Sequence, residues 1–135
     1  MNGLDLSDAV KARLVSSVPS RTVFAGAVPD GVLPASYLVV WASEGFEESS
    51  RSTSTTNVQT PALWVTSVSR NAKPDVAARE AAWGAAKVRA VLRNWRPDGG
   101  WLLRAEVSAP PQRESSGTVS TFTATEQFSV RTNLP

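Results

Sequence analysis

Two residue types that carry much of enzyme chemistry are missing from this chain. Its 135 residues contain no Cys and no His. A Ser-His-Asp or Cys-His nucleophile system therefore cannot be assembled, and zinc sites built from thiolate or imidazole are excluded. Disulfides are excluded as well. We expect a protein that is not an enzyme and that has no cofactor and no metal site, so carboxylates and exposed aromatic side chains are the remaining candidates for function.

Glu126 is the carboxylate in the most unusual sequence context. It falls on the apolar face of the last predicted strand, where a buried catalytic carboxylate could stand. No second acid, base or nucleophile accompanies it at a recognisable spacing. The simpler interpretations are a position near the end of the sheet, an Arg partner or a neighbouring subunit.

A second group of carboxylates, Glu44, Glu47 and Glu48, lacks the alternating Asp/Asn-Gly spacing of a calcium loop and indicates a solvated loop rim. It opens the polar segment 45–57, GFEESSRSTSTTN, which predicts a flexible loop between two strands. One basic residue and no interleaved aromatics make this loop a poor nucleic-acid groove. Its candidate contact residues for a protein partner are Phe46, Glu47, Glu48 and Arg51.

The segment 73–96, KPDVAAREAAWGAAKVRAVLRNWR, predicts a long helix that begins at Pro74 and ends before Pro97. At helical spacing, one apolar stripe suits packing on a sheet. The stripe consists of Ala77, Ala81, Gly84, Val88, Val91, Leu92 and Trp95. Trp83 lies about a third of a turn from the centre of that stripe, where a monomer normally meets water.

Trp83 is therefore the sharpest functional candidate. Burying its indole would stabilise the folded protein by several kcal/mol as an upper bound, at about 25 cal/mol per Å². Either the N-terminal helix or a loop covers it within one monomer, or it forms a subunit contact with charged neighbours as a polar rim. The candidate subunit interface consists of Val76, Arg79, Glu80, Trp83 and Lys87.

The elements that position these residues predict one α+β domain over residues 1–135. The spacing of Leu6, Val10 and Leu14 predicts a short N-terminal helix over 4–17. Strands are expected at 21–27, 37–43, 58–69, 101–108 and 119–131, with a Pro-rich turn at 109–116. The predicted order is helix, three strands, helix, two strands, in a mostly antiparallel sheet with the long helix packed on one face.

Charge and hydropathy restrict the possible partners. The formal charge of +2 gives no support to nucleic-acid binding. No apolar run is long enough for a membrane span, and the charged first twenty residues do not resemble a signal peptide. We expect a cytoplasmic protein without a membrane partner.

The chain resembles the tail terminator, or tail completion, proteins of long-tailed phages. The resemblance covers most of the chain and rests on the element order and on four segments. These segments are PASYLVVWASEG, PALWVTSVSR, DVAAREAAWGAAKVRAVL and FSVRTNLP. Family members are described as small α+β proteins that form a six-membered ring, which caps the tail tube and presents a surface to the head connector.

The resemblance implies a virion structural protein at the head-proximal end of a tail, present in the host cytoplasm during assembly. Its expected partners are further copies of itself, the tail tube protein and the head–tail connector protein, with at most non-specific passage of DNA. The Trp83 face would contact a neighbouring subunit through a heterologous interface. The loop at 45–57 would touch the tail tube or line the lumen, where acidic residues would repel DNA phosphates.

Two alternatives remain from the sequence. Another neck component, such as a head–tail adaptor, differs from a terminator mainly in its docking partner. A small pocket protein of the nuclear-transport-factor-like type would instead use Trp41, Trp64 and Trp101 as a binding interior. The missing His disfavours its enzymatic form.

Overall fold

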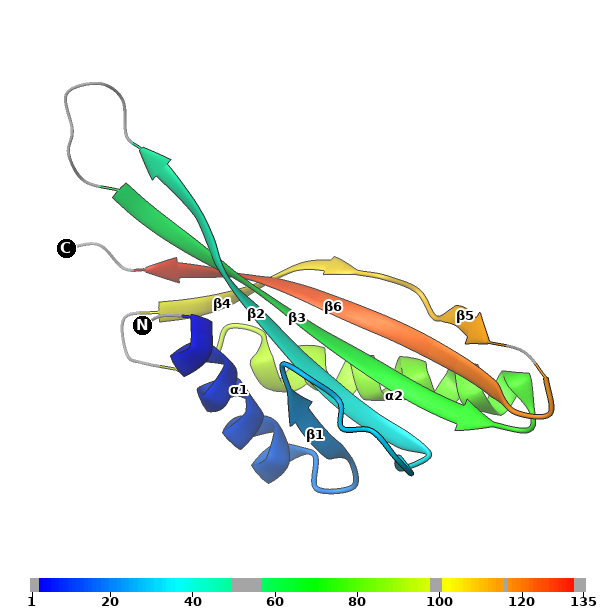
Figure 1. Ribbon diagram of the computed structural model, residues 1–135. Coiled ribbons are helices and arrows are strands. Elements are labelled where there is room, and N and C mark those ends of the chain that lie inside the picture. Colours follow the sequence, from blue (N-terminus) through cyan, green and yellow to red (C-terminus); the bar gives the residue numbers. More distant parts are fainter. Residues whose placement is uncertain (1–2, 50–56, 98–100, 116, 133–135) are drawn as a thin grey trace.

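The computed structural model describes residues 3–49, 57–97, 101–115 and 117–132. Within these ranges the chain forms two helices and six strands, which confirms the α+β class (Figure 1). In chain order the elements are α1 (Gly3–Ser17), β1 (Thr22–Ala25), β2 (Ser36–Ser49), β3 (Asn57–Asn71), α2 (Pro74–Leu92), β4 (Trp101–Ser108), β5 (Gln112–Ser115) and β6 (Ser120–Thr132). Neither described helix combines the length and apolar character that crossing a lipid bilayer requires.

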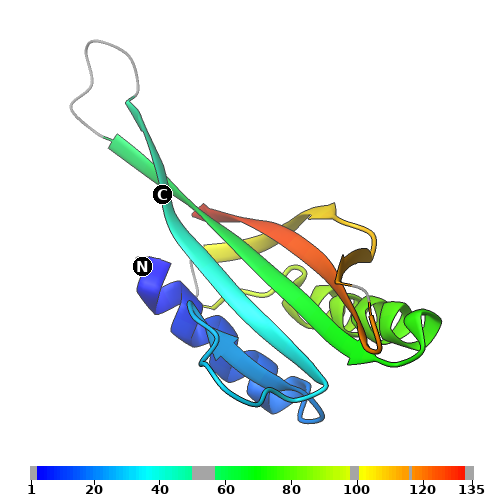
Figure 2. The ribbon, with the colours of Figure 1, turned by 45° about the vertical axis from the view of Figure 1, so that its right-hand side comes forward.

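The strands form one sheet in the order β1-β2-β3-β6-β4, and β5 pairs with β6 beside β4. Only the edge strand β1 runs parallel to its neighbour among the described pairs; the other pairs are antiparallel. The two strands predicted on either side of the polar segment pair with each other as a hairpin of β2 and β3. Figures 1 and 2 show that this hairpin projects beyond the rest of the sheet.

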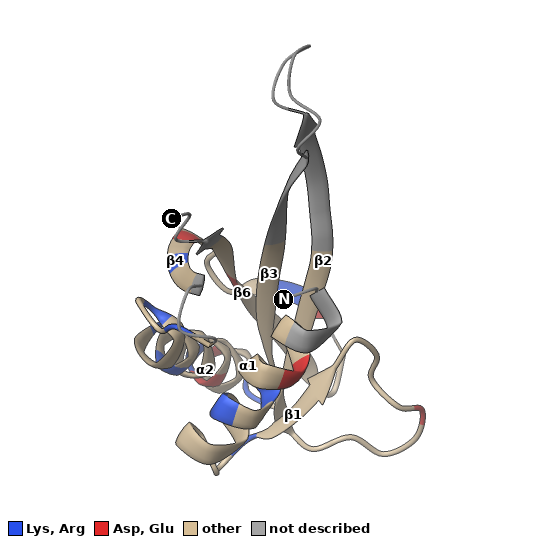
Figure 3. Cartoon of the chain, turned by 90° about the vertical axis from the view of Figure 1, so that its left-hand side faces the viewer, with Lys and Arg blue, Asp and Glu red and all other residues tan. Residues whose placement is uncertain are grey.

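The main core lies between one face of the sheet and the two helices, with α1 beside α2 (Figure 3). The predicted stripe of α1, Leu6, Val10 and Leu14, is fully buried there. It packs with alternate residues of the strands, because successive side chains of a strand point to opposite faces. The largest members from the sheet are Leu38, Leu63, Leu103 and Phe128, all 0% exposed.

The predicted stripe of α2 also packs on the sheet, and small side chains set its distance. Ala81 and Ala85 cluster with Ala124 of β6. Gly84 lies over Ser67 of β3, which pairs with Ala124 in the strand register. Small residues on both surfaces let the helix backbone approach the strands closely, as the sequence predicted for Gly84 and the Ala positions.

The face of the sheet that points away from the two helices is covered at one end by the segment between β1 and β2. There the segment between β1 and β2 contributes Val28 and Leu33 against Tyr37, Val39 and Val68. Farther along the same face, Trp41 of β2 pairs with Trp64 of β3 in the register. Trp41 is 44% exposed and Trp64 is half-buried, so they do not form the aromatic interior that a pocket protein requires. The side chain of Trp101 lies outside the described residues.

The long helix ends at Leu92, four residues earlier than predicted from the sequence. Arg93 N still donates to Arg89 O at 2.9 Å, but Asn94 takes a left-handed conformation with φ 60°. Asn tolerates this conformation at a helix end. Beyond it the backbone pairs with β4, since Asn94 N donates to Leu103 O at 2.9 Å. Hydrogen bonds to β4 take the place of further hydrogen bonds within the helix. Trp95, which is half-buried, therefore packs against the main core from a loop and not from the helix.

Two details after α2 also differ from the prediction. The expected turn at 109–116 contains the short strand β5. The two prolines before it interrupt the edge of the sheet, where a missing backbone N–H is tolerated, but they do not reverse the chain. β5 therefore pairs antiparallel with β6, as β4 does. In a regular strand Val107 would lie on the same face as Leu103 and Ala105, but it is 53% exposed. The register shift between Ala105 and Val107 turns its side chain to the open face.

The predicted loop at 45–57 is shorter than expected. Residues 45–49 belong to β2, and Asn57 begins β3. The ladder continues past the register shift between Ser43 and Phe46, because backbone hydrogen bonds do not require apolar side chains. Residues 50–56 lie outside the described part.

Candidate functional site

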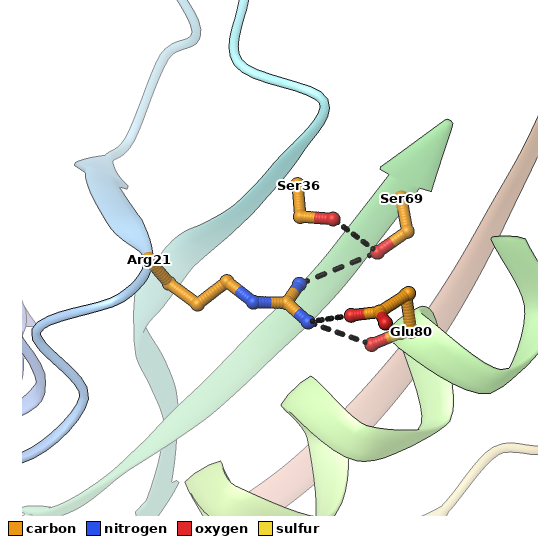
Figure 4. Close-up of polar contacts among 4 residues, drawn as sticks. All are labelled: Arg21, Ser36, Ser69 and Glu80. Carbon is orange, nitrogen blue, oxygen red and sulfur yellow. Dashed lines mark hydrogen bonds and ion pairs between the residues drawn. The ribbon is translucent and has the colours of Figure 1, made fainter. Parts of the chain in front are cut away.

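Arg21 joins three elements of the fold at one point. It lies just before β1, and its side chain, 4% exposed, extends across the helix side of the sheet towards α2 (Figure 4). Nη1 donates to Ser69 Oγ of β3 at 3.3 Å. Nη2 donates to the carbonyl oxygen and to Oε2 of Glu80 on α2, each at 3.0 Å. Ser36 Oγ of β2 lies 2.9 Å from Ser69 Oγ and extends the cluster to a fourth element.

The positive charge of Arg21 is permanent although it is buried. Burial lowers the pKa of the Arg21 guanidinium from its ordinary value, and the Glu80 carboxylate opposes this shift. An Arg side chain still remains protonated at physiological pH. A buried charge requires hydrogen bonds and a counter-charge, and Glu80 supplies the latter from a side chain that is 54% exposed.

Trp83 lies directly beside this cluster. The Arg21 Cζ atom is 5.0 Å from the centre of the Trp83 ring, and the Lys87 Nζ atom is 5.5 Å from it. These are cation–π distances. The ring nevertheless stays 43% exposed, so neither α1 nor a loop of the described chain buries it. The two cations hold the indole in place while leaving much of it in solvent.

An open recess of about 550 Å³ adjoins the Trp83 ring. Its lining consists of Ser20, Arg21, Ser36, Arg79, Glu80 and Trp83. Two guanidinium groups face one carboxylate, so the lining is net positive. The Glu80 carboxylate forms an ion pair with Arg21, whereas Arg79 forms no ion pair within the described part of the chain. Guanidinium donors, hydroxyls and an aromatic surface suit binding of an anionic and partly apolar group.

The residues predicted as a subunit interface lie on one face of α2. Val76 is half-buried, and the others, Arg79, Glu80, Trp83 and Lys87, are exposed. Sequence reasoning treated Glu80 only as a polar rim. It missed the partner Arg21 and the two serines, Ser69 and Ser36, that continue the hydrogen-bonded cluster. One signal was available, because Ser69 alternates with Val65 and Leu63 on a strand face that is otherwise buried.

The second predicted contact group begins on a long strand. Phe46, Glu47 and Glu48 belong to the distal end of β2, where their backbones pair with residues 58–60 of β3. Arg51 lies outside the described residues. A role for this group at a tail tube or in a lumen remains a prediction.

Glu126 is buried, as its place on the apolar strand face indicated, with 4% of its surface exposed. Ser108 Oγ lies 2.7 and 2.6 Å from its two carboxylate oxygens. Arg89 Nη1 contacts Ser108 Oγ and lies 3.7 Å from Glu126 Oε2. The Arg partner was one of the alternatives expected from the sequence. This cluster fastens α2 to β4 and β6 and offers no nucleophile–base pair.

Replacing Glu126 with Gln is expected to lower the free energy of unfolding by about 1 kcal/mol, because Arg89 is 42% exposed and its ion pair is partly screened by solvent. Urea denaturation of the two proteins measures the difference. Groups held for catalysis often destabilise the fold. A gain in stability for Glu126→Gln would therefore contradict the structural role assigned to this carboxylate.

Comparison by sequence gives no relative: no protein-family model matches the chain, and no curated protein matches it. Among solved structures, a chain from the virion of a native gene transfer agent particle is similar over 93% of this chain and 93% of its own length, with a TM-score of 0.55 and 18% identity. A second solved protein is similar over 97% of this chain and 91% of its own length, with a TM-score of 0.45 and 18% identity, a likeness too weak to establish a shared fold. The first likeness establishes a shared fold.

Proposed function

We propose that this protein is a structural component of a phage-like virion and acts as a tail terminator. Copies of the chain would form a ring that caps the tail tube and presents a surface to the head connector. The observation that carries the proposal is the fold shared, over nearly the whole chain, with a protein of a gene transfer agent virion. The element order and the quoted segments resemble the terminator family independently of that likeness.

The exposed Trp83 supports an assembly role. A ring requires each subunit to present two different complementary patches. The indole, held by Arg21 and Lys87 and adjoined by a positive recess, has the composition of an interface centre with a polar rim. Nothing in the recess lining provides a nucleophile activated by a base, so binding fits it better than turnover.

A head–tail adaptor is the closest competing role and differs in its partner. Light scattering of the purified protein over a range of concentrations tests for self-association, and a ring of six 14.4 kDa chains is the expected product. Binding to a tail tube protein tests the docking partner. A chain that stays monomeric and binds no tube protein would overturn the proposal, whereas binding only to the connector would favour the adaptor.

Replacing Trp83 with Ala is expected to weaken assembly by about tenfold or more and to lower the melting temperature to a smaller extent, because truncation of a central interface aromatic costs more than about 1 kcal/mol of binding free energy. Sedimentation velocity and thermal unfolding measure the two effects. Trp41→Ala is a matched control, since Trp41 is 44% exposed on the other sheet face. A large loss of stability in Trp83→Ala with assembly intact would instead assign Trp83 to the monomer core.

A further inference from the structure

The segment between β1 and β2 presents an unusual pair of side chains at its tip. Residues 29–32 read Pro-Asp-Gly-Val, and Gly31 has a φ of 109° that favours glycine at this turn. Val32 is 104% exposed, more than any other large hydrophobic residue described. Asp30 is exposed and forms no ion pair with a described residue. The tip therefore offers a carboxylate and an isopropyl group that have no partner among the residues the structure describes.

The recess beside Trp83 offers the complementary groups. Arg79 is an exposed guanidinium without an ion pair in the described chain, and Trp83 is an exposed apolar ring. Because Glu80 is engaged by Arg21, an incoming carboxylate would meet Arg79 without displacing an existing ion pair. Charge-assisted hydrogen bonds between Arg and carboxylate are among the stronger polar contacts in proteins.

The tip and the recess of one molecule lie on different sides of the sheet. The recess lies on the helix side, between α2 and the start of β1. The segment between β1 and β2 packs on the opposite face and projects away from α2 (Figure 3). Contact between the two patches therefore requires two molecules. Because the two patches differ, repeating the contact in one direction from copy to copy gives a head-to-tail assembly, which closes into a ring when the rotation between copies allows it, as the proposed ring function requires.

We propose that the tip of one copy inserts into the recess of the next copy, with Asp30 on Arg79 and Val32 against Trp83. This contact rests on the proposed ring function and names its subunit interface. Burial of the fully exposed isopropyl group supplies apolar contact. The ion pair fixes the orientation of the two subunits.

A charge exchange tests the contact. Asp30→Arg and Arg79→Asp are each expected to raise the concentration at which half the protein is assembled by about tenfold or more, since each places like charges together. The double variant Asp30→Arg/Arg79→Asp restores the pair in reverse and is expected to recover most of the wild-type assembly. Sedimentation velocity measures assembly, and thermal unfolding shows whether each variant remains folded. Asp8→Arg and Arg93→Asp, at exposed positions outside both patches, are the matched controls.

The outcomes separate this contact from the proposed function. A wild-type oligomer that neither single substitution weakens overturns the contact and leaves the ring standing. Disruption by Arg79→Asp alone means that the recess takes a different occupant, and a double variant as weak as the singles also overturns the pairing. A wild-type chain that is monomeric yet binds tail tube protein overturns this contact only. A chain that is monomeric and binds no tube protein overturns both.

Discussion

Replacing Gly84 with Val is expected to lower the free energy of unfolding by about 3 kcal/mol, because the added side chain has no space between α2 and β3. A Cβ at this position would collide with Ser67 Oγ and would lie 3.1 Å from Ser67 Cβ and 3.4 Å from Arg21 Nη1. Ser67 is fully buried, so it has nowhere to move. The helix would have to lift from the sheet, which would also disturb the Arg21 cluster.

Urea denaturation gives the free energy, and thermal unfolding is expected to shift by about 10 °C. The matched control is Ala86→Val, which introduces the same side chain at an exposed position of the same helix. It is expected to cost well below 1 kcal/mol, since a β-branched residue only slightly disfavours a helix. Equal effects of the two substitutions would mean that helix propensity, and not the close approach to Ser67, explains the loss.

Gly84 also illustrates why much of the fold was predictable from the sequence. The helical period of α2 placed Ala77, Ala81 and Gly84 on one stripe, and the structure buries all three. The spacing of apolar residues indicates which face of a helix or strand is buried, because every turn or every second residue of that face must be apolar. It also excluded Trp83 from that stripe, and the ring is 43% exposed.

The parts that were missed depend on contacts between distant segments. The pairing of Asn94 with Leu103 ends α2 early, and no local signal requires it. The bond from Arg21 to Glu80 spans 59 residues, so neither residue type nor spacing could predict it. The register shift before Val107 likewise depends on how two strands meet. In each case, contacts between segments that are distant in the sequence determine the structure, and these contacts override the preference of the local sequence pattern.

Arg21→Ala is expected to lower the free energy of unfolding by about 3 kcal/mol, because it removes three hydrogen bonds, the buried side chain and the guanidinium that lies over the Trp83 ring. The carboxylate of Glu80 remains 54% exposed in the wild type and can be hydrated when its partner is lost. The loss therefore comes mainly from packing and from the bonds to neutral groups. Urea denaturation at low and at high salt measures it.

Glu80→Ala separates the ion pair from the rest of the cluster. It is expected to cost about 1 kcal/mol, because Arg21 keeps its bonds to Ser69 and to the backbone carbonyl of residue 80. In a double-mutant cycle, the coupling between Arg21 and Glu80 is then expected to be about 1 kcal/mol and to shrink as salt rises. A coupling as large as the whole Arg21→Ala effect would show that the ion pair itself holds α2 against β1. The smaller coupling that we expect would mean that the Arg21 guanidinium holds α2 mainly through Ser69, the helix backbone and the Trp83 ring. The recess would then keep its structure when the carboxylate of Glu80, the counter-charge of Arg21, is removed.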